Sequence, residues 1–179
     1  MGQGDSIEPI IRLIGPHDSV AELTLLLHRA YGALAERGMR FLASHQDEER
    51  TRMRIEQSEC YLAIHQGRMI GTISWRDSQQ TRGSPWYDRP DVSSFGQFAV
   101  EPAWQRRTIG SQLLTIAEQR AAKAGAAEMA LDTAEPADDL IRFYGKRGYR
   151  FIEYAQWKEV NYRSVILSKQ IAAAKLLET

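Results

Sequence analysis

The segment with the clearest chemical potential covers residues 100–111 and joins the end of a predicted strand to the start of a predicted helix. The first N–H groups of a helix have no partner inside the helix and lie at the positive end of its dipole, so they favour a phosphate. Gly110 would let that phosphate approach closely, and Arg106 and Arg107 add cationic donors beside the same turn. The arrangement suits a pyrophosphate. Two solvated arginines in an ordinary turn are the alternative.

Two motifs in this region resemble those of the GCN5-related N-acetyltransferase superfamily. The residues that match its acetyl-CoA motif are Val100, Pro102, Gln105, Arg106 and Gly110. Downstream, residues 143–149 read Phe-Tyr-Gly-Lys-Arg-Gly-Tyr and resemble the end of the family's following helix. The motifs occur in the family's order and spacing, and the resemblance covers nearly the whole chain. It implies an enzyme that moves an acetyl group from acetyl-CoA directly to a primary amine of a small molecule or a peptide.

The resemblance also assigns expected roles to individual residues. The expected cofactor-binding residues are Phe98, Val100, Gln105, Arg106, Arg107, Thr108, Ile109, Gly110 and Ser111. In the family, the strand that ends at Val100 and the one at residues 127–133 part, and the thioester lies in the gap. Tyr144 is the counterpart of the family's proton donor to the departing thiolate, a task that suits a phenol. From its type alone, Tyr144 would be an aromatic packing residue beside Phe143.

Three positions depart from the family pattern. Thr108 stands where the family has its first motif glycine, so this turn needs αR or β dihedrals at that point or carries strain. Ala137 replaces an asparagine that holds pantetheine, and Gln97 replaces a carboxylate that many relatives use as a base. An amide can hold a water but cannot act as a base. We name no general base, because solvated surface positions are the default for the nearest carboxylates, Asp77, Asp88, Asp91 and Asp132.

The elements that must position these residues follow from hydrophobic periodicity and turn residues. Strands are predicted at residues 7–14, 59–65, 69–75, 94–100, 127–133, 149–158 and 162–168, and helices at 20–38, 46–58, 109–124 and 138–146. Ser19 followed by Glu22 has the pattern of a capping box at the first helix. The charges of the second helix indicate a solvated face. Residues 77–92 form the longest predicted loop.

The order strand, helix, strand over residues 94–133 predicts a parallel pair inside an otherwise antiparallel sheet. The expected fold is therefore α/β, or mixed α+β: a central, mostly antiparallel sheet with one parallel βαβ pair and helices on both faces, in one domain of residues 1–179. An acceptor pocket would be assembled from the first helices, the 77–92 loop and the last hairpin. Trp75, Trp86, Tyr87 and Trp157 could wall it, although Trp75 and Trp157 lie on predicted strands, where core packing is the default.

Composition excludes several classes of protein. Among 179 residues, 23 basic and 23 acidic side chains give a formal net charge of zero, so a nucleic-acid partner is not expected. The apolar stretches fall far short of the ~20 residues that cross a bilayer, so a membrane partner is not expected either. The single cysteine, Cys60, fits a small buried residue in a reducing cytoplasm, and four scattered histidines predict no metal site.

Two other classes of function remain open alongside the enzyme. The departures at Gln97, Thr108 and Ala137 leave room for a non-catalytic acyl-CoA-binding sensor or interaction module. A nucleotide-binding module could use the same helix N-terminus, although the chain has no Gly-x-Gly-x-x-Gly turn. The identity of the acceptor is not readable from the sequence, and a homodimer is left open.

Overall fold

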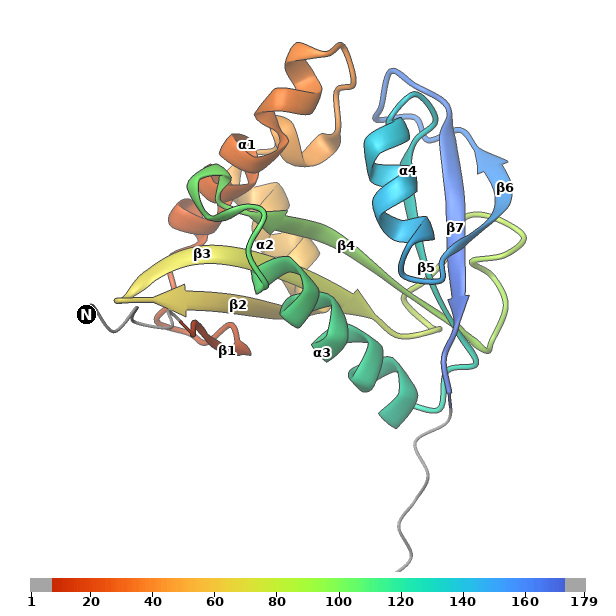
Figure 1. Cartoon of the computed structure of the whole chain (residues 1–179), viewed down its shortest axis with the longest axis horizontal. Helices are drawn as coiled ribbons and strands as arrows, with labels where there is room; N and C mark the ends of the chain where they lie inside the picture. The colour runs from red at the N-terminus through yellow and green to blue at the C-terminus, as the bar shows by residue number, and fades with distance from the viewer. Residues whose placement is uncertain (1–7, 173–179) are drawn as a thin grey trace, which may run out of the picture.

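The computed structural model describes residues 8–172, which form one seven-stranded sheet with helices packed against it (Figure 1). The strands are β1 (Ile10–Leu13), β2 (Glu59–His65), β3 (Arg68–Arg76), β4 (Val92–Val100), β5 (Glu128–Ala134), β6 (Arg150–Ala155) and β7 (Ser164–Gln170). The helices are α1 (Val20–Glu36), α2 (Glu48–Glu56), α3 (Ile109–Lys123) and α4 (Asp138–Gly145), and short 3₁₀ turns lie at Leu42–Ser44 and Pro102–Trp104.

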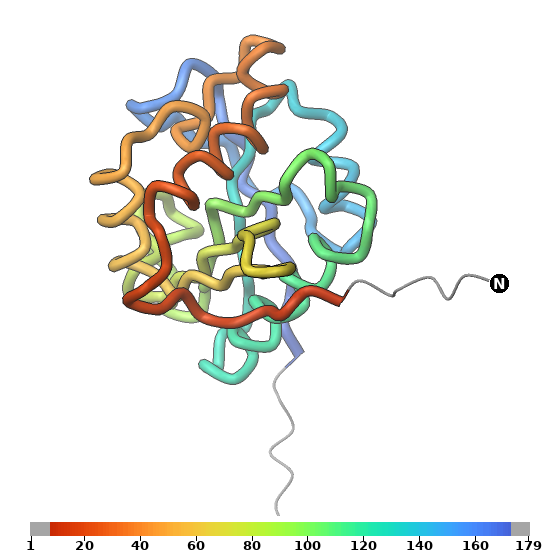
Figure 2. Tube along the Cα trace, turned by 90° about the vertical axis from the view of Figure 1, so that its left-hand side faces the viewer, coloured from red at the N-terminus to blue at the C-terminus, as the bar shows by residue number. Residues whose placement is uncertain are grey.

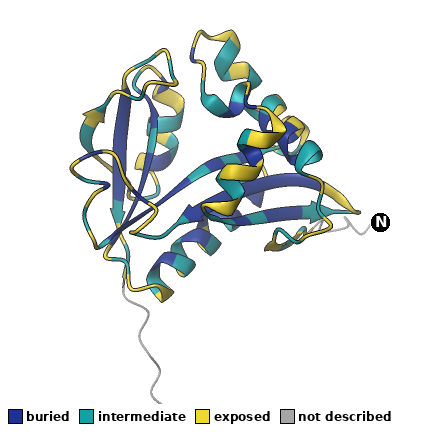
Figure 3. Cartoon of the chain, turned by 180° about the vertical axis from the view of Figure 1, so that it is seen from behind, coloured by how far each residue is buried: buried dark blue, intermediate teal, exposed yellow. Residues whose placement is uncertain are grey.

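The strand order is β1-β2-β3-β4-β5-β7-β6, and β4 and β5 are the parallel pair in this sheet. Helix α3 is the crossover between them. A core cluster built around Leu113 and Ala117 of α3 packs against β3, β4 and β5, and a second cluster built around Leu23 and Leu27 of α1 lies against β2 and β3. Seen from behind, the buried residues line the contacts between the helices and the sheet (Figure 3). The predicted mixed sheet with helices on both faces is confirmed.

The first helix begins as its sequence predicts, with one difference. Ser19 Oγ accepts a hydrogen bond from the Glu22 N–H at 3.1 Å, which satisfies one of the free donors of α1. The Glu22 carboxylate does not return to the cap, because it accepts the Met69 N–H at 2.9 Å instead. The capping box is therefore half formed, and its acidic member ties α1 to the start of β3.

The parallel pair holds together over only a short distance. Val92, Ser93 and Ser94 of β4 are in register with residues 128–130 of β5, and beyond this point the two strands part (Figure 1). Strand β4 also carries a bulge against β3, where Gln97 has a φ of +45°. A bulge increases local twist and bends its strand. The parting expected from the family resemblance is thus present.

Aromatic rings fill the space beside the parted strands. Phe95 and Phe98 of β4 lie 6.0 and 6.5 Å from the Tyr144 ring of α4, and Tyr149 lies 5.8 Å from it. These centroid separations are typical of favourable edge and tilted ring pairs. The rings pack β4 against α4 and the start of β6 beside the parting.

Several predicted boundaries were wrong. Strand β4 begins at Val92, so the 77–92 loop is shorter than expected, and β6 ends at Ala155, so Trp157 follows a strand and does not lie on one. The short 3₁₀ turns were not predicted. Cys60 lies in β2 and is buried, as expected. Residue 7 of the first predicted strand lies outside the described residues.

The described residues were also searched for two further features. No helix within residues 8–172 is long and apolar enough to cross a membrane. The same part of the chain holds no group of at least three His, Cys, Asp or Glu side chains arranged to bind a metal ion.

Candidate active site

The start of α3 presents a row of free backbone donors. Within residues 8–172, the N–H groups of residues 106–111 have no hydrogen-bond acceptor, and the first helical bond of α3 runs from the Gln112 N–H to the Thr108 carbonyl at 2.9 Å. Thr108 adopts φ −76° and ψ −5°, so the αR expectation for this departure is confirmed. The left-handed conformation falls on Arg106, with φ +61°. We call residues 105–111 the α3 turn.

The side chains of the α3 turn leave its N–H groups open. Gln105 Nε2 donates to the Val100 carbonyl at 3.1 Å and closes the turn onto the end of β4. Arg106 and Arg107 are exposed and form no ion pair with a described residue, and Arg107 stacks on the Trp104 ring. A groove of about 470 Å³ runs along α3 from Thr108 to Ile116, against Glu8, Pro9 and Ile11. The turn itself combines free donors with cationic groups.

Two further members of the predicted set have different roles in the turn. Ile109 is buried in the core, so only its N–H faces outward. Gly110 lies against β4, where an added Cβ would stand 3.6 Å from both Phe98 and Val100. Sequence reasoning missed Arg147, which donates to Ser111 Oγ at 3.0 Å and so brings another guanidinium to the turn.

Tyr144 projects from α4 toward the parted strands with its hydroxyl unused. It is 7% exposed, and no residue within 8–172 accepts or donates a hydrogen bond at that hydroxyl. Burial raises the pKa of Tyr144 far above its ordinary value, with contributions in the same direction from Tyr31 and Asp132. The phenol is therefore fully protonated at neutral pH.

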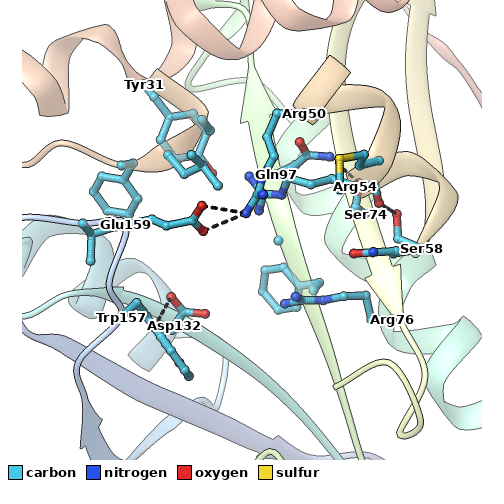
Figure 4. A pocket seen from close by; sticks show the side chains of 18 of the residues that line it. Tyr31, Arg50, Arg54, Ser58, Ser74, Arg76, Gln97, Asp132, Trp157 and Glu159 are labelled. Atoms are coloured by element: carbon cyan, nitrogen blue, oxygen red, sulfur yellow. Dashed lines mark hydrogen bonds and ion pairs between the residues drawn. The ribbon is translucent and has the colours of Figure 1, made fainter. Parts of the chain in front are cut away.

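A cavity of about 520 Å³ lies on the other side of the parted strands (Figure 4). Its walls include the first helices, the 77–92 loop and the connection between β6 and β7, which are the segments expected to form an acceptor pocket. The end of β3, the middle of β4 and Asp132 of β5 also line it and were not expected. Tyr87 and Trp157 line it, whereas Trp75 belongs to the core. We call this space the central cavity.

Asp132 is the carboxylate that the sequence interpretation misplaced. It lies on the parted section of β5 and lines the central cavity, where Tyr87 Oη donates to its Oδ1 at 2.9 Å and Trp157 Nε1 to its Oδ2 at 3.1 Å. The expectation of a solvated surface position is wrong here, because alternation along a fully buried strand does not reveal which side faces a cavity. The two aromatic donors fix the carboxylate and account for Tyr87 in the predicted loop.

The other surveyed carboxylates have local roles. Asp77 Oδ1 accepts the N–H groups of Gln79 and Gln80, and Asp88 Oδ1 accepts the Gly83 N–H, so both stabilise the loop that follows β3. Asp91 forms an ion pair with Arg89 at 2.7 Å.

Two arginines converge on the same spot of the cavity wall. The Nη2 atoms of Arg54, from α2, and Arg76, at the end of β3, lie 3.6 and 3.7 Å from the position a Cβ would take at Gly96. Neither guanidinium pairs with a carboxylate among residues 8–172; Arg54 donates only to Gln46 Oε1, at 2.7 Å. The expectation that the charges of the second helix form a solvated face is wrong for Arg54.

The electrostatic cost of this arrangement appears at Arg54. Burial, with the nearby positive charge of Arg76 as the next cause, lowers the pKa of Arg54 to about 10. Because this pKa is lower in the folded protein than in the unfolded chain, the charge on Arg54 reduces stability at neutral pH. The reduction is full below about pH 10 and is lost as the pH rises from there toward the ordinary pKa of an arginine.

Gln97 belongs to a buried network beside the arginines. Its Oε1 accepts from Gln46 Nε2 at 2.8 Å and its Nε2 donates to Ser74 Oγ at 3.2 Å. Both ends of the amide are thus bound to protein groups, and the network fixes the bulge of β4. At the second departure, Ala137 is fully buried at the start of α4 and offers no side-chain donor.

The open end of the parted sheet is bridged by polar contacts. Arg50 of α2 forms an ion pair at 2.7 Å with Glu159 from the β6–β7 connection, at the mouth of the central cavity (Figure 4). Asn161 of the same connection accepts the Arg40 N–H and donates to the Gly38 carbonyl, both at 2.9 Å. In the turned view, the end of α1 and the β6–β7 connection lie side by side (Figure 2).

A helix N-terminus with free N–H groups beside a parted parallel pair defines the class of protein: an acyltransferase that uses an acyl-CoA donor. The family model described as "Acetyltransferase (GNAT) family" matches residues 22–149. The chain therefore belongs to the acetyltransferase (GNAT) family, and it is an acetyl-CoA-dependent N-acetyltransferase.

Named relatives agree with this assignment. The chain is 31% identical over 148 residues to S-(2-succino)cysteine N-acetyltransferase of Bacillus subtilis strain 168, covering 80% of this chain and 85% of the relative. It is 33% identical over 89 residues to aminoalkylphosphonate N-acetyltransferase of Salmonella typhimurium, covering 50% and 54%. The crystal structure of a GNAT family acetyltransferase from Elizabethkingia anophelis with acetyl-CoA bound has a TM-score of 0.64 at 16% identity, over 91% of this chain and 98% of that chain.

The convergence of Arg54 and Arg76 leads to a prediction about stability. We expect Arg76→Gln to raise the free energy of unfolding by ~0.5–1.5 kcal/mol at neutral pH, because it removes the positive charge that lies beside Arg54. Denaturant unfolding at low and high salt measures the effect, which salt should reduce. Arg12→Gln, which breaks an exposed ion pair with Asp18, is the matched control and should lower stability by at most ~1 kcal/mol. A clear loss of stability in Arg76→Gln would contradict the prediction.

Proposed function

We propose that this enzyme transfers the acetyl group to the amine of a small molecule that binds in the central cavity. The observation that carries the proposal is that the two sites meet at the parted strands. The α3 turn adjoins the end of β4 at Val100, and the central cavity is lined by residues 95–97 of β4 and by Asp132 of β5. A donor held at the turn and an acceptor held in the cavity would meet without a carrier residue on the protein.

The residues of the α3 turn fit the diphosphate of acetyl-CoA. The N–H groups of residues 106–111 and the exposed Arg106 and Arg107 would hold it, with the Thr108 hydroxyl as a further donor. Beyond Ser94, the backbone groups of β4 that face β5 have no ladder partner. The Phe98 and Val100 carbonyls already accept from Tyr31 Oη and Gln105 Nε2. The remaining polar groups need a partner, which the pantetheine arm supplies in this proposal. With Ala137 in place of an asparagine, backbone groups would make these contacts alone.

Acetyl-CoA supplies an acetyl thioester to the site. In the transfer, the neutral amine nitrogen forms a bond to the acetyl carbon and gives up one proton to water, the carbon–sulfur bond breaks, and the sulfur receives a proton from a donor that water then reprotonates. Tyr144 is the group that gives this proton in our proposal, because its hydroxyl is protonated and has no partner among the described residues. The incoming ammonium must first lose one proton. Asp132 is a carboxylate that lines the central cavity, and in this proposal its role is to bind the amine.

Two supporting facts favour a small-molecule enzyme over a sensor or a peptide modifier. Both named relatives are N-acetyltransferases whose names specify small amines. The central cavity is bounded on two sides by α2 and the β6–β7 connection, joined by the Arg50–Glu159 ion pair, which suits a compact acceptor. A homodimer and a cytoplasmic location stay predictions from the sequence.

Gly110 tests the role of the α3 turn. We expect Gly110→Val to weaken acetyl-CoA binding at least tenfold, about 1.4 kcal/mol, because its two methyl groups, added beside Phe98 and Val100, would displace the α3 turn from the end of β4. A Cβ alone makes only ordinary contacts with Phe98 and Val100, so the displacement should be local and leave the fold intact. Calorimetry measures the affinity. Gly32→Val, in α1 with open space around it, is the matched control, and unchanged affinity in a folded Gly110→Val enzyme would contradict the role.

Thr108 tests a side-chain contact to phosphate. Its hydroxyl caps no N–H of α3, so its loss should leave the helix start unchanged. We expect Thr108→Val to weaken CoA by ~0.5–1.5 kcal/mol while pantetheine, which lacks the diphosphate, binds as before. Thr108→Ser keeps the hydroxyl and should bind CoA normally. Equal losses for CoA and pantetheine would indicate a backbone effect instead.

Tyr144 tests the proton donor. Tyr144→Phe keeps the ring in its aromatic cluster and should lower kcat by roughly 100-fold or more, with little change in acetyl-CoA affinity. The control is Tyr149→Phe, which removes a neighbouring hydroxyl that is bonded to Glu118 Oε1 at 2.9 Å and should leave kcat near the parent value. Turnover of the Tyr144→Phe enzyme within about twofold of the parent, with chemistry limiting the rate, would assign the proton to water and leave Tyr144 a packing role.

A further inference from the structure

The wall of the central cavity contains an unusual pair of charges. Arg54 and Arg76 come from different elements, yet their Nη2 atoms approach one point above Gly96, at 3.6 and 3.7 Å. The separation of the two Nη2 atoms therefore cannot exceed the sum of these two distances. Like charges so close repel each other, and the repulsion is strong where water is partly excluded.

The carboxylate of Asp132, across the cavity, offsets the positive charge of Arg54 only in part. Of the other charged groups that line the cavity, Arg50 pairs with Glu159, and Arg82 donates to the carbonyls of Ser78 and Thr81. No carboxylate of this part of the chain pairs with either Arg54 or Arg76. Neighbouring groups hold Arg54 in place nonetheless, since Gln46 Oε1 accepts from its Nη1 at 2.7 Å.

The point where the two guanidiniums meet is also bare. Gly96 contributes only backbone there, and a Cβ at this position would lie within 3.7 Å of both Nη2 atoms. A carboxylate or phosphonate presents two or three oxygens, each of which accepts N–H donors at about 2.7–2.9 Å. Such an oxyanion would sit above Gly96 and receive donors from both arginines, which converts their repulsion into binding.

Asp132 supplies the opposite charge elsewhere in the cavity. Figure 4 shows Arg54 and Arg76 entering from one side and Asp132, held by Trp157, from the other. Each carboxylate oxygen of Asp132 accepts one described hydrogen bond, which leaves lone pairs for a cationic donor. An ammonium placed there would lie on β5 beyond the point where β4 and β5 part, on the side of the acetyl thioester in our proposed function.

We propose that the acceptor is a small amine that carries a carboxylate or phosphonate, with its oxyanion bound between Arg54 and Arg76 above Gly96 and its amine bound at Asp132. This inference rests on the proposed function for the position of the amine. The anion site itself stands on the geometry of the two arginines. An amine without an oxyanion would leave the charges of the two arginines uncompensated, and a polycation would be repelled by them.

Acetyl transfer to matched amines tests the acceptor class. The pairs are β-alanine with β-alaninamide, 2-aminoethylphosphonate with ethanolamine, and L-aspartate with its diamide; the first two pairs also separate carboxylate from phosphonate. We expect the member of at least one pair that bears the oxyanion to have a kcat/KM at least 100-fold higher than its partner without one. Arg54→Gln or Arg76→Gln should reduce that ratio below tenfold without changing acetyl-CoA affinity. Arg12→Gln, with its charge on β1, should keep the ratio.

A titration that needs no turnover tests the anion site separately. Methylphosphonate and succinate are added to the enzyme while the arginine Nε–Hε resonances are followed, with those of Arg54 and Arg76 assigned by their loss in the two variants. We expect saturable shifts of these two resonances with Kd of about 1 mM or tighter.

The two experiments distinguish the possible failures. Equal or faster transfer to the amines without an oxyanion would overturn the inference and leave the acetyltransferase reaction intact. A lack of saturable response of Arg54 and Arg76 to either anion would do the same. Transfer to none of the amines would count against the proposed small-molecule function, and the titration would still decide the anion site.

Discussion

The parting of β4 from β5 is the constraint on which the rest of the molecule depends. A sheet normally satisfies its backbone groups through neighbouring strands, and here the ladder stops after Ser94 and Ala130 although both strands continue. The bulge at Gln97 turns β4 away, the Gln46–Gln97–Ser74 hydrogen bonds fix that turn, and aromatic rings occupy the space that opens. The α3 turn and the central cavity lie beside the sections of β4 and β5 that are not paired with each other.

Local patterns in the sequence were sufficient to predict the part of the site that depends on one element. A strand end, a turn and an amphipathic helix follow each other directly, so the α3 turn and the parallel crossover could be located from spacing. The conformation at Thr108 was also predictable, because a β-branched residue resists a positive φ. Arg106 takes the left-handed conformation instead, which no residue preference indicates.

The part of the site that depends on tertiary packing could not be predicted in the same way. Arg54 lies on a helix rich in charge, and its sequence does not show which of its arginines enters the protein. Asp132 lies on a strand buried on both faces, so its carboxylate interrupts no alternation that could be read. A formal net charge of zero for the whole chain likewise conceals a cavity with an excess of positive charge. The residues of the proposed acceptor site therefore come together through long-range contacts, whereas those of the proposed acetyl-CoA site lie in short sequence motifs.

The bridge between α2 and the β6–β7 connection affects how the two halves of the sheet move. Strands β1 to β4 and strands β5 to β7 are joined by backbone pairing at one end. At the other end the halves meet through exposed polar contacts such as Arg50–Glu159, and through an apolar cluster in which Met39 and Phe41 pack with Ala134, Ala137 and Tyr162. Exposed ion pairs contribute only about 0–1 kcal/mol each. Breaking the Arg50–Glu159 ion pair to admit a ligand therefore costs little, whereas moving the two halves of the sheet apart would expose the apolar cluster around Met39 and Ala134.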